Sequence, residues 1–128
     1  MPNSELKMTT ANRKVNPHLV ELIGYLKAVS RENEARVWRD VAERLERSGK
    51  NWSEVNVSRL ARFAKEGEML VVPGKLLGSG TISFGVTVAA YKTSAQAKGK
   101  IEAVGGKAMT IKELVAANPS GEGIRIMG

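Results

Sequence analysis

The sequence has no cysteine, one histidine and few aromatic residues, and each scarcity excludes a class of protein. Without cysteine among its 128 residues, the chain has no disulfide scaffold, thiol nucleophile or cysteine-based zinc site. The single histidine, His18, cannot build a two-histidine metal site, so we expect no metal. Aromatic residues make up 5% of the chain, which disfavours a protein that binds single strands by stacking bases.

Long apolar runs and common enzyme motifs are also missing. Apolar stretches such as 69–72 fall far short of the roughly 18 residues that cross a bilayer. The N-terminus has no apolar segment typical of a secretory signal, so a cytoplasmic location is the default expectation. There is no Walker loop or Gly-x-Ser-x-Gly elbow, and Gly78-Ser79-Gly80 lacks the third glycine of a dinucleotide-binding motif. We expect neither a catalytic activity nor a cofactor, although carboxylates alone can catalyse proton transfer.

The charge has one dominant sign. Lys and Arg number 20 against 13 Asp and Glu, a net charge of +7, which indicates a polyanionic partner such as nucleic acid or an anionic membrane. Eleven of the 13 glycines lie from Gly67 onward. These distributions predict a flexible basic arm (1–15) and one domain (16–128), which is helical over 16–66 and mixed α/β over 67–128.

Hydrophobic spacing predicts the helices of the first half. Asn16 and Pro17 are typical of a helix start, and apolar residues at i, i+3, i+4 and i+7 predict a helix to about Val29. After this helix we expect a polar connection over 30–35, a helix over 36–47, a break at 48–51 and a helix over 55–65.

The second half alternates short apolar runs with cap residues. Runs at 69–72, 86–90, 107–109 and 123–127 predict strands. Ser94 and Thr110 are typical N-caps and predict two short helices. The glycine-rich segment 73–80 is expected to be a loop.

The expected helices over 36–47 and 55–65 differ from each other in how their positive charge is neutralised. Over 36–47, each arginine has an acidic residue four positions away, so a self-paired solvated face is the main interpretation, and Arg36 and Arg39 are the better candidates for RNA contact. Over 55–65, a helical wheel places Val57, Leu60, Ala61, Phe63 and Ala64 on the apolar side. The polar side carries Ser58, Arg59, Arg62 and Lys65 with no acid. We interpret that face as a phosphate-binding surface; an ordinary solvated face is the alternative, and a membrane is less favoured.

The segment 73–80 is a second candidate site. Its glycines permit close backbone approach, and successive amides beside Lys75 can form an anion-binding concavity. A plain connecting loop remains the alternative. Trp38 and Trp52 are expected to pack against helices rather than stack on bases.

Three stretches together resemble a known family. They are NPHLVELI (16–23), WRDVAERL (38–45) with VNVSR (55–59), and VVPGKLLGSG (71–80) followed by VTVAA (86–90). They are similar to the archaeal large-subunit ribosomal protein eighteen-e, a relative of bacterial large-subunit protein fifteen. The resemblance covers nearly the whole chain from Asn16 to Met127, and VVPGKLLGSG is its most specific part.

The resemblance implies an α/β fold in which N-terminal helices precede irregular β-β-α turns with short strands and helices. It also implies a non-catalytic protein that binds large-subunit ribosomal RNA and neighbouring ribosomal proteins. A small enzyme acting on a phosphorylated ligand at the glycine loop, or a non-ribosomal RNA-binding module, is the alternative. With the charge analysis, we expect phosphate contacts from Arg13, Lys14, Arg36, Arg39, Arg59, Arg62 and Lys75, and close backbone approach at Gly74, Gly78, Ser79 and Gly80.

Overall fold

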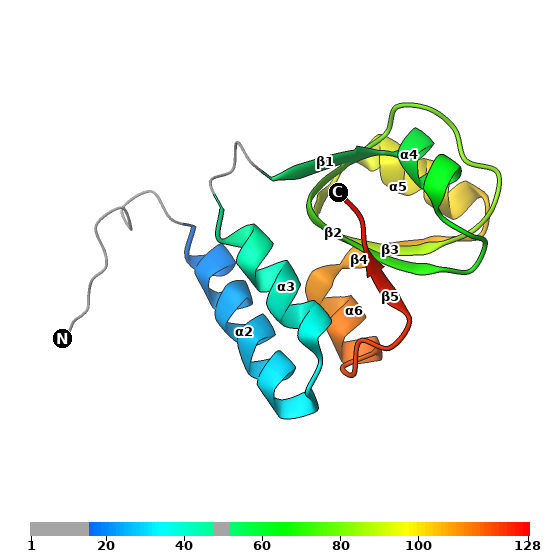
Figure 1. Ribbon diagram of the computed structural model, residues 1–128. Coiled ribbons are helices and arrows are strands. Elements are labelled where there is room, and N and C mark those ends of the chain that lie inside the picture. The colour runs from blue at the N-terminus through cyan, green and yellow to red at the C-terminus, as the bar shows by residue number, and fades with distance from the viewer. Residues whose placement is uncertain (1–15, 48–51) are drawn as a thin grey trace.

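The computed structural model describes residues 16–47 and 52–128, and these form a mixed α/β structure (Figure 1). The predicted arm (1–15) and the predicted break at 48–51 lie outside the described residues, and the division into an arm and one domain stays a prediction. The elements in chain order are α2 (Pro17–Asn33), α3 (Arg36–Leu45), β1 (Ser53–Asn56), α4 (Val57–Phe63), β2 (Met69–Leu77), β3 (Thr87–Thr93), α5 (Ala95–Ala103), β4 (Lys107–Thr110), α6 (Ile111–Ala117) and β5 (Ile124–Ile126). Helices come first and short strands and helices follow, so the predicted fold class is confirmed.

The strands form one parallel sheet organised around β2. The main order is β1-β2-β3-β4, and β5 also pairs with β2. Because β3 runs along one edge of β2, the other edge is shared by two short strands. There β5 pairs with the first part of β2 (69–71), and β1 pairs with its last part (74–77).

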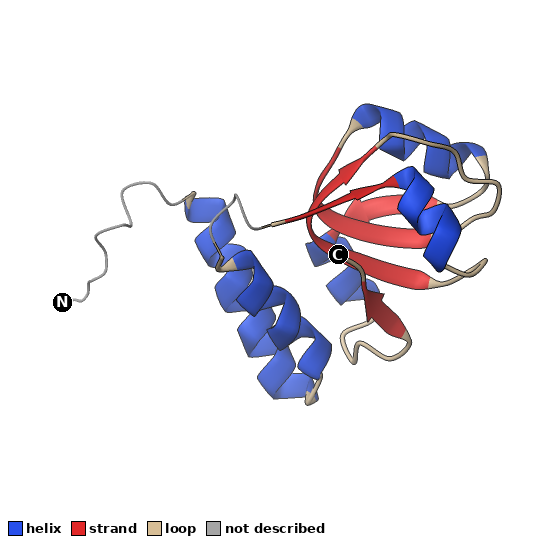
Figure 2. Cartoon of the chain, turned by 45° about the horizontal axis from the view of Figure 1, so that its top comes forward, coloured by secondary structure: helices blue, strands red, loops and turns tan. Residues whose placement is uncertain are grey.

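Helices cover both faces of the sheet (Figure 2). Successive residues of a strand point to opposite faces. Leu70 and Val72 of β2 pack in one core with α4 and α5, whereas Val71 packs in a second core with α2, α3 and α6. A parallel sheet buried on both faces needs apolar residues at consecutive positions, which is what the run at 69–72 supplies.

The predicted caps are confirmed. The Asn16 side chain accepts a hydrogen bond from the His18 backbone amide at 2.8 Å. The Ser94 hydroxyl accepts from the Ala97 amide at 3.1 Å. Thr110 and Glu113 form a reciprocal capping box, which satisfies backbone donors at the start of α6.

Helix α2 is longer than predicted. The expected polar connection over 30–35 is wrong, because α2 continues to Asn33 and ends at Glu34, whose φ of 51° is left-handed. The polar residues there face solvent, so they do not interrupt the helix, while Val29 and Ala35 stay buried. None of the helices within 16–47 and 52–128 is long and apolar enough to span a membrane.

The predicted third helix is partly a strand. Residues 53–56 form β1, and α4 begins only at Val57. Val55 is buried in β1, and its β-branched side chain favours extended backbone. Val57 is also buried but is already the first residue of α4, so Val55 alone was too weak a signal to predict the strand.

The predicted loop over 73–80 is also partly a strand. Strand β2 runs through Pro73 and Gly74 to Leu77. Proline lacks an amide donor, and Pro73 falls between the paired registers on both edges of β2, where the pairing with β3 is irregular. A Cβ at Gly74 would overlap the backbone oxygen of Ser53. Glycine at this position therefore lets β1 approach β2.

This close approach predicts the effect of Gly74→Ala. The added methyl group must push β1 away from β2, so we expect the free energy of unfolding in urea to fall by about 1–3 kcal/mol. The control is Gly24→Ala in α2, where a Cβ meets no atom within 4 Å and should raise the free energy of unfolding by about 0.5–1 kcal/mol. Equal effects of the two substitutions would contradict the steric role of Gly74.

Candidate nucleic-acid interface

Helix α4 carries an exposed basic surface, which we call the α4 cationic face (Arg59 and Arg62). The predicted helix to residue 65 ends early: α4 stops at Phe63 and Ala64 is extended, so Lys65 is exposed beyond the end of the helix and belongs to no helical face. Arg59 and Arg62 define the face. Their side chains are exposed, whereas Val57 and Leu60 on the opposite side of the helix are fully buried. Within residues 16–47 and 52–128, no carboxylate forms an ion pair with Arg59 or Arg62. The positive charge of this face is therefore available to an external anion.

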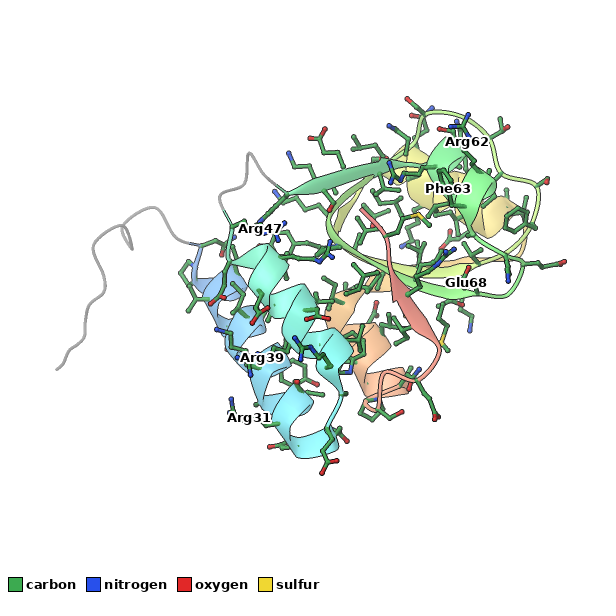
Figure 3. The ribbon with its side chains drawn as sticks, viewed as in Figure 1. Arg31, Arg39, Arg47, Arg62, Phe63 and Glu68 are labelled. Carbon is green, nitrogen blue, oxygen red and sulfur yellow. The ribbon has the colours of Figure 1, made fainter. Side chains whose placement is uncertain are left out.

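Phe63 lies on this same surface, contrary to the prediction that it belongs to the apolar side of the helix. It is 52% exposed, and the guanidinium carbons of Arg59 and Arg62 lie 5.6 and 5.9 Å from its ring centroid (Figure 3). At 100° per residue, Phe63 lies roughly 120° from Val57 and roughly 60° from Leu60, which places it at the edge of the apolar arc. The apolar character of the side chain misled the prediction.

The exposed turn at Ser79 and Gly80 packs directly against the start of α4. The Ser58 amide donates to the Ser79 carbonyl oxygen at 3.0 Å. Gly80 has a φ of +91°, and a Cβ there would strike the Ser58 side chain. The fold therefore brings the predicted glycine segment and the predicted basic helix to one place, and the two residues in contact, Ser58 and Ser79, are 21 positions apart in the sequence.

The backbone of this turn is not the cradle of free amides that the glycine spacing predicted. The Ser79 amide already donates to the Asn56 side-chain oxygen at 3.2 Å. The carbonyl oxygens of Gly78 and Gly80 accept from the Lys100 ammonium at 2.6 and 2.5 Å. Sequence analysis missed Lys100, because nothing near it indicates a contact with a turn 20 residues away.

Gly74 and Lys75 do not lie in the exposed turn. Gly74 is buried in β2, where it pairs with Ser53 of the neighbouring strand β1. Lys75 is half-buried, and its register partners are Glu54 on β1 and Lys92 on β3. Gly78 is also buried, so only two of the four positions predicted for close backbone approach, Ser79 and Gly80, are exposed.

Arg36 and Arg39 of α3 form a separate and largely neutralised surface, whereas Arg44 donates to the Gly128 carbonyl oxygen at 3.0 Å. Arg36 pairs with Asp40 at 3.7 Å and Arg39 pairs with Glu43 at 3.2 Å, as the i, i+4 spacing predicted. Helices α3 and α4 pack on opposite faces of the sheet, so the structure does not bring these arginines to the α4 cationic face (Figure 3). The predicted contacts at Arg13 and Lys14 lie outside the described residues.

The tryptophans pack inside the protein, as predicted. Trp38 is fully buried and donates to the Pro119 carbonyl oxygen at 2.9 Å. Trp52 is half-buried, donates to the Leu45 carbonyl oxygen at 3.2 Å, and meets Tyr91 edge-on at 5.0 Å between ring centroids. Neither ring is a free stacking surface.

Metal and small-molecule chemistry find little support in the described residues. Within 16–47 and 52–128, no three His, Asp or Glu side chains gather where they could hold a metal ion. His18 is exposed at the rim of an open cavity of about 290 Å³, next to Glu21, Tyr91 and Lys112. Among the described contacts, no carboxylate forms an ion pair with the His18 ring.

The contacts of Lys100 predict how the turn responds to its removal. Lys100→Ala deletes the donor for two carbonyl oxygens, so local opening of residues 78–86 should become easier by about 1 kcal/mol, since this contact is partly exposed. We expect amide hydrogen exchange in that segment to accelerate about fivefold. Lys98→Ala, at an exposed position on the same helix, should leave the exchange unchanged. Equal exchange in both variants would show that Lys100 does not hold the turn.

Comparison with known proteins identifies the chain's family. Residues 3–128 match the model of a family described as ribosomal protein 60S L18 and 50S L18e. Proteins named large ribosomal subunit protein eL18 are similar to this chain: that of Methanospirillum hungatei is 52% identical and covers 94% of this chain and 99% of its own. Those of Methanococcus maripaludis and Archaeoglobus fulgidus are each 50% identical, covering 88% and 90% of this chain and 93% and 98% of their own. The resemblance seen in the sequence is confirmed, and the chain belongs to the family of ribosomal proteins 60S L18 and 50S L18e.

Proposed function

We infer that this chain is a structural constituent of the large ribosomal subunit that binds ribosomal RNA in the cytoplasm. The observation that carries this conclusion is the family match over residues 3–128, together with relatives of nearly the same length that are named large-subunit proteins. The net charge of +7 suits an RNA partner. The family is a non-enzymatic one, which supports the expectation of no catalytic activity.

We propose that the α4 cationic face and the neighbouring turn at Ser79 and Gly80 form the main RNA contact. Arg59 and Arg62 are exposed beside this turn, so one stretch of RNA backbone can meet both. Neutralising phosphates releases counterions, which supplies binding free energy without reading sequence. Lys100, held beside the turn by two carbonyl oxygens, adds a positive charge to the same region.

The other predicted contacts are retained as secondary contacts. Arg36 and Arg39 must exchange their carboxylate partners for phosphate, so each contributes less than an unpaired arginine. Lys75 contacts RNA only at the edge where β1 leaves it half-exposed. Arg13 and Lys14 contact phosphate as part of the basic N-terminal segment. Double-stranded ribosomal RNA presents mainly its shape, phosphates and 2′-hydroxyls to such a surface.

The two alternative functions receive no support from a specific observation. A phosphate-binding enzyme needs free donors at the glycine turn, and the Ser79 amide is occupied by Asn56. A non-ribosomal RNA-binding module is not favoured by relatives that are all named as ribosomal proteins.

The salt dependence of RNA binding tests the α4 cationic face. Replacing Arg59 and Arg62 together with Gln should weaken binding of the chain to large-subunit RNA and reduce the slope of log K against log salt by about 1–2. The matched variant replaces Arg36 and Arg39 with Gln, and its slope should change less because both arginines are already paired. An unchanged slope after substitution on α4 would reject this face as the phosphate contact.

Sedimentation tests the assignment to the ribosome. A tagged copy of the chain expressed in an archaeon should migrate with large subunits and dissociate from them at high salt, because phosphate contacts are screened. A thermal-shift screen with nucleotides and sugar phosphates should show no stabilisation. Free migration together with stabilisation by one of these ligands would favour the enzyme instead.

A further inference from the structure

We propose that Phe63 is a stacking site for one unpaired nucleobase of the bound RNA. This inference rests on the proposed function and goes further, because it adds recognition of an exposed base to contacts with phosphates. The scarcity of aromatic residues excludes a long stacking surface along single-stranded RNA, but it leaves room for one site.

The surroundings of Phe63 distinguish it from an ordinary exposed apolar residue. A single apolar side chain on a protein surface needs no explanation by itself. Val20 on α2 is 53% exposed, close to the 52% of Phe63, but its aliphatic side chain has no ring face on which a base could stack. The guanidinium groups of Arg59 and Arg62 lie over the Phe63 ring at 5.6 and 5.9 Å from its centroid, and about half of the residue is exposed.

A hollow beside the ring provides space for the base. It has a volume of about 210 Å³ and is lined by Arg59, Phe63, Arg125 and the chain from Ile126 to Gly128. Phe63 and Arg59 thus belong both to the hollow and to the α4 cationic face. A base inserted there can stack on the ring while its own phosphate remains beside Arg59 or Arg62.

Arg125 is fixed at the edge of this hollow. Its guanidinium donates to the Phe63 carbonyl oxygen at 2.5 Å and to the Glu68 carboxylate at 3.0 Å. Figure 3 labels the two partners, Phe63 and Glu68. This clamp holds the end of α4 against strand β5, although the two segments are 62 residues apart. The backbone that carries the Phe63 ring is therefore held in place before a base binds.

The charge around the hollow favours RNA over a protein partner. Glu68 neutralises Arg125, whereas no carboxylate in the described residues pairs with Arg59 or Arg62. An exposed aromatic ring beside two arginines without carboxylate partners is complementary to a base with its phosphate, because the base can stack on the ring while the phosphate pairs with an arginine.

Two RNA hairpins test this proposal with the full chain. They have the same sequence and one bulged position, which carries adenosine in the first hairpin and an abasic ribose in the second. We expect the wild-type chain to bind the adenosine hairpin about tenfold more tightly, the equivalent of about 1.4 kcal/mol for stacking one base. Phe63→Leu should remove this preference, and Phe63→Trp should retain it, because indole also stacks.

Two further variants separate stacking from other effects. Val20→Ala removes an equally exposed apolar side chain and should leave the preference intact. Replacing Arg59 and Arg62 with Gln should weaken binding of both hairpins. Phe63→Leu should unfold at the temperature of the wild type, because Phe63 is not among the residues packed in either core.

The outcomes distinguish this proposal from the proposed function. If the wild-type chain binds both hairpins equally, or if Phe63→Leu retains the preference, Phe63 does not stack a base and the RNA-binding function stands. If equal hairpin binding is accompanied by poor incorporation of Phe63→Leu into large subunits, a neighbouring protein covers Phe63 and the proposal is overturned. If the chain binds neither hairpin and does not bind large-subunit RNA, the proposed function fails as well.

Discussion

The burial of strand β2 on both faces is the constraint on which the rest of the structure depends. A parallel strand in this position needs helices above and below it, because its apolar residues point alternately to the two sides. Its second edge must also accommodate two short strands, and Gly74 leaves space for one of them. The order of helices along the chain follows: α2 and α3 cover one face, and α4 is carried to the other by β1.

This arrangement also determines where positive charge collects. Val57 and Leu60 on the apolar side of α4 are buried in the core, so the arginines on the other side of the helix face solvent. The connection after β2 returns beside the same helix and forms the turn that Lys100 holds. Arginines on α3 carry the same formal charge, but their helix supplies its own carboxylates. Whether a cationic side chain is available to phosphate therefore depends less on its formal charge than on whether a nearby acidic residue neutralises it.

The family explains why such a small protein needs no catalytic machinery. A ribosomal protein stabilises RNA through many modest contacts, and its surface is built for charge neutralisation and shape. The Glu68–Arg125 ion pair is consistent with this role, since it holds the end of α4 in place and so positions the RNA-binding surface. The stacking site proposed at Phe63 would fix the position of this surface along the RNA, whose phosphate backbone is otherwise uniform.

Local sequence determined the caps at Asn16, Ser94 and Thr110, the α/β class and the acid-free face of α4, because each depends on residues within about one helical turn. The same reasoning failed where the decisive partner was distant. Residues 53–56 and 73–77 became strands because they pair with each other, and the Ser79 amide was occupied by Asn56 rather than left free. Propensity reports only local preference, and hydrogen bonds between distant segments override it. The chain's own chemistry thus specified which residues could bind an anion, and only the tertiary structure decided which of them lie together.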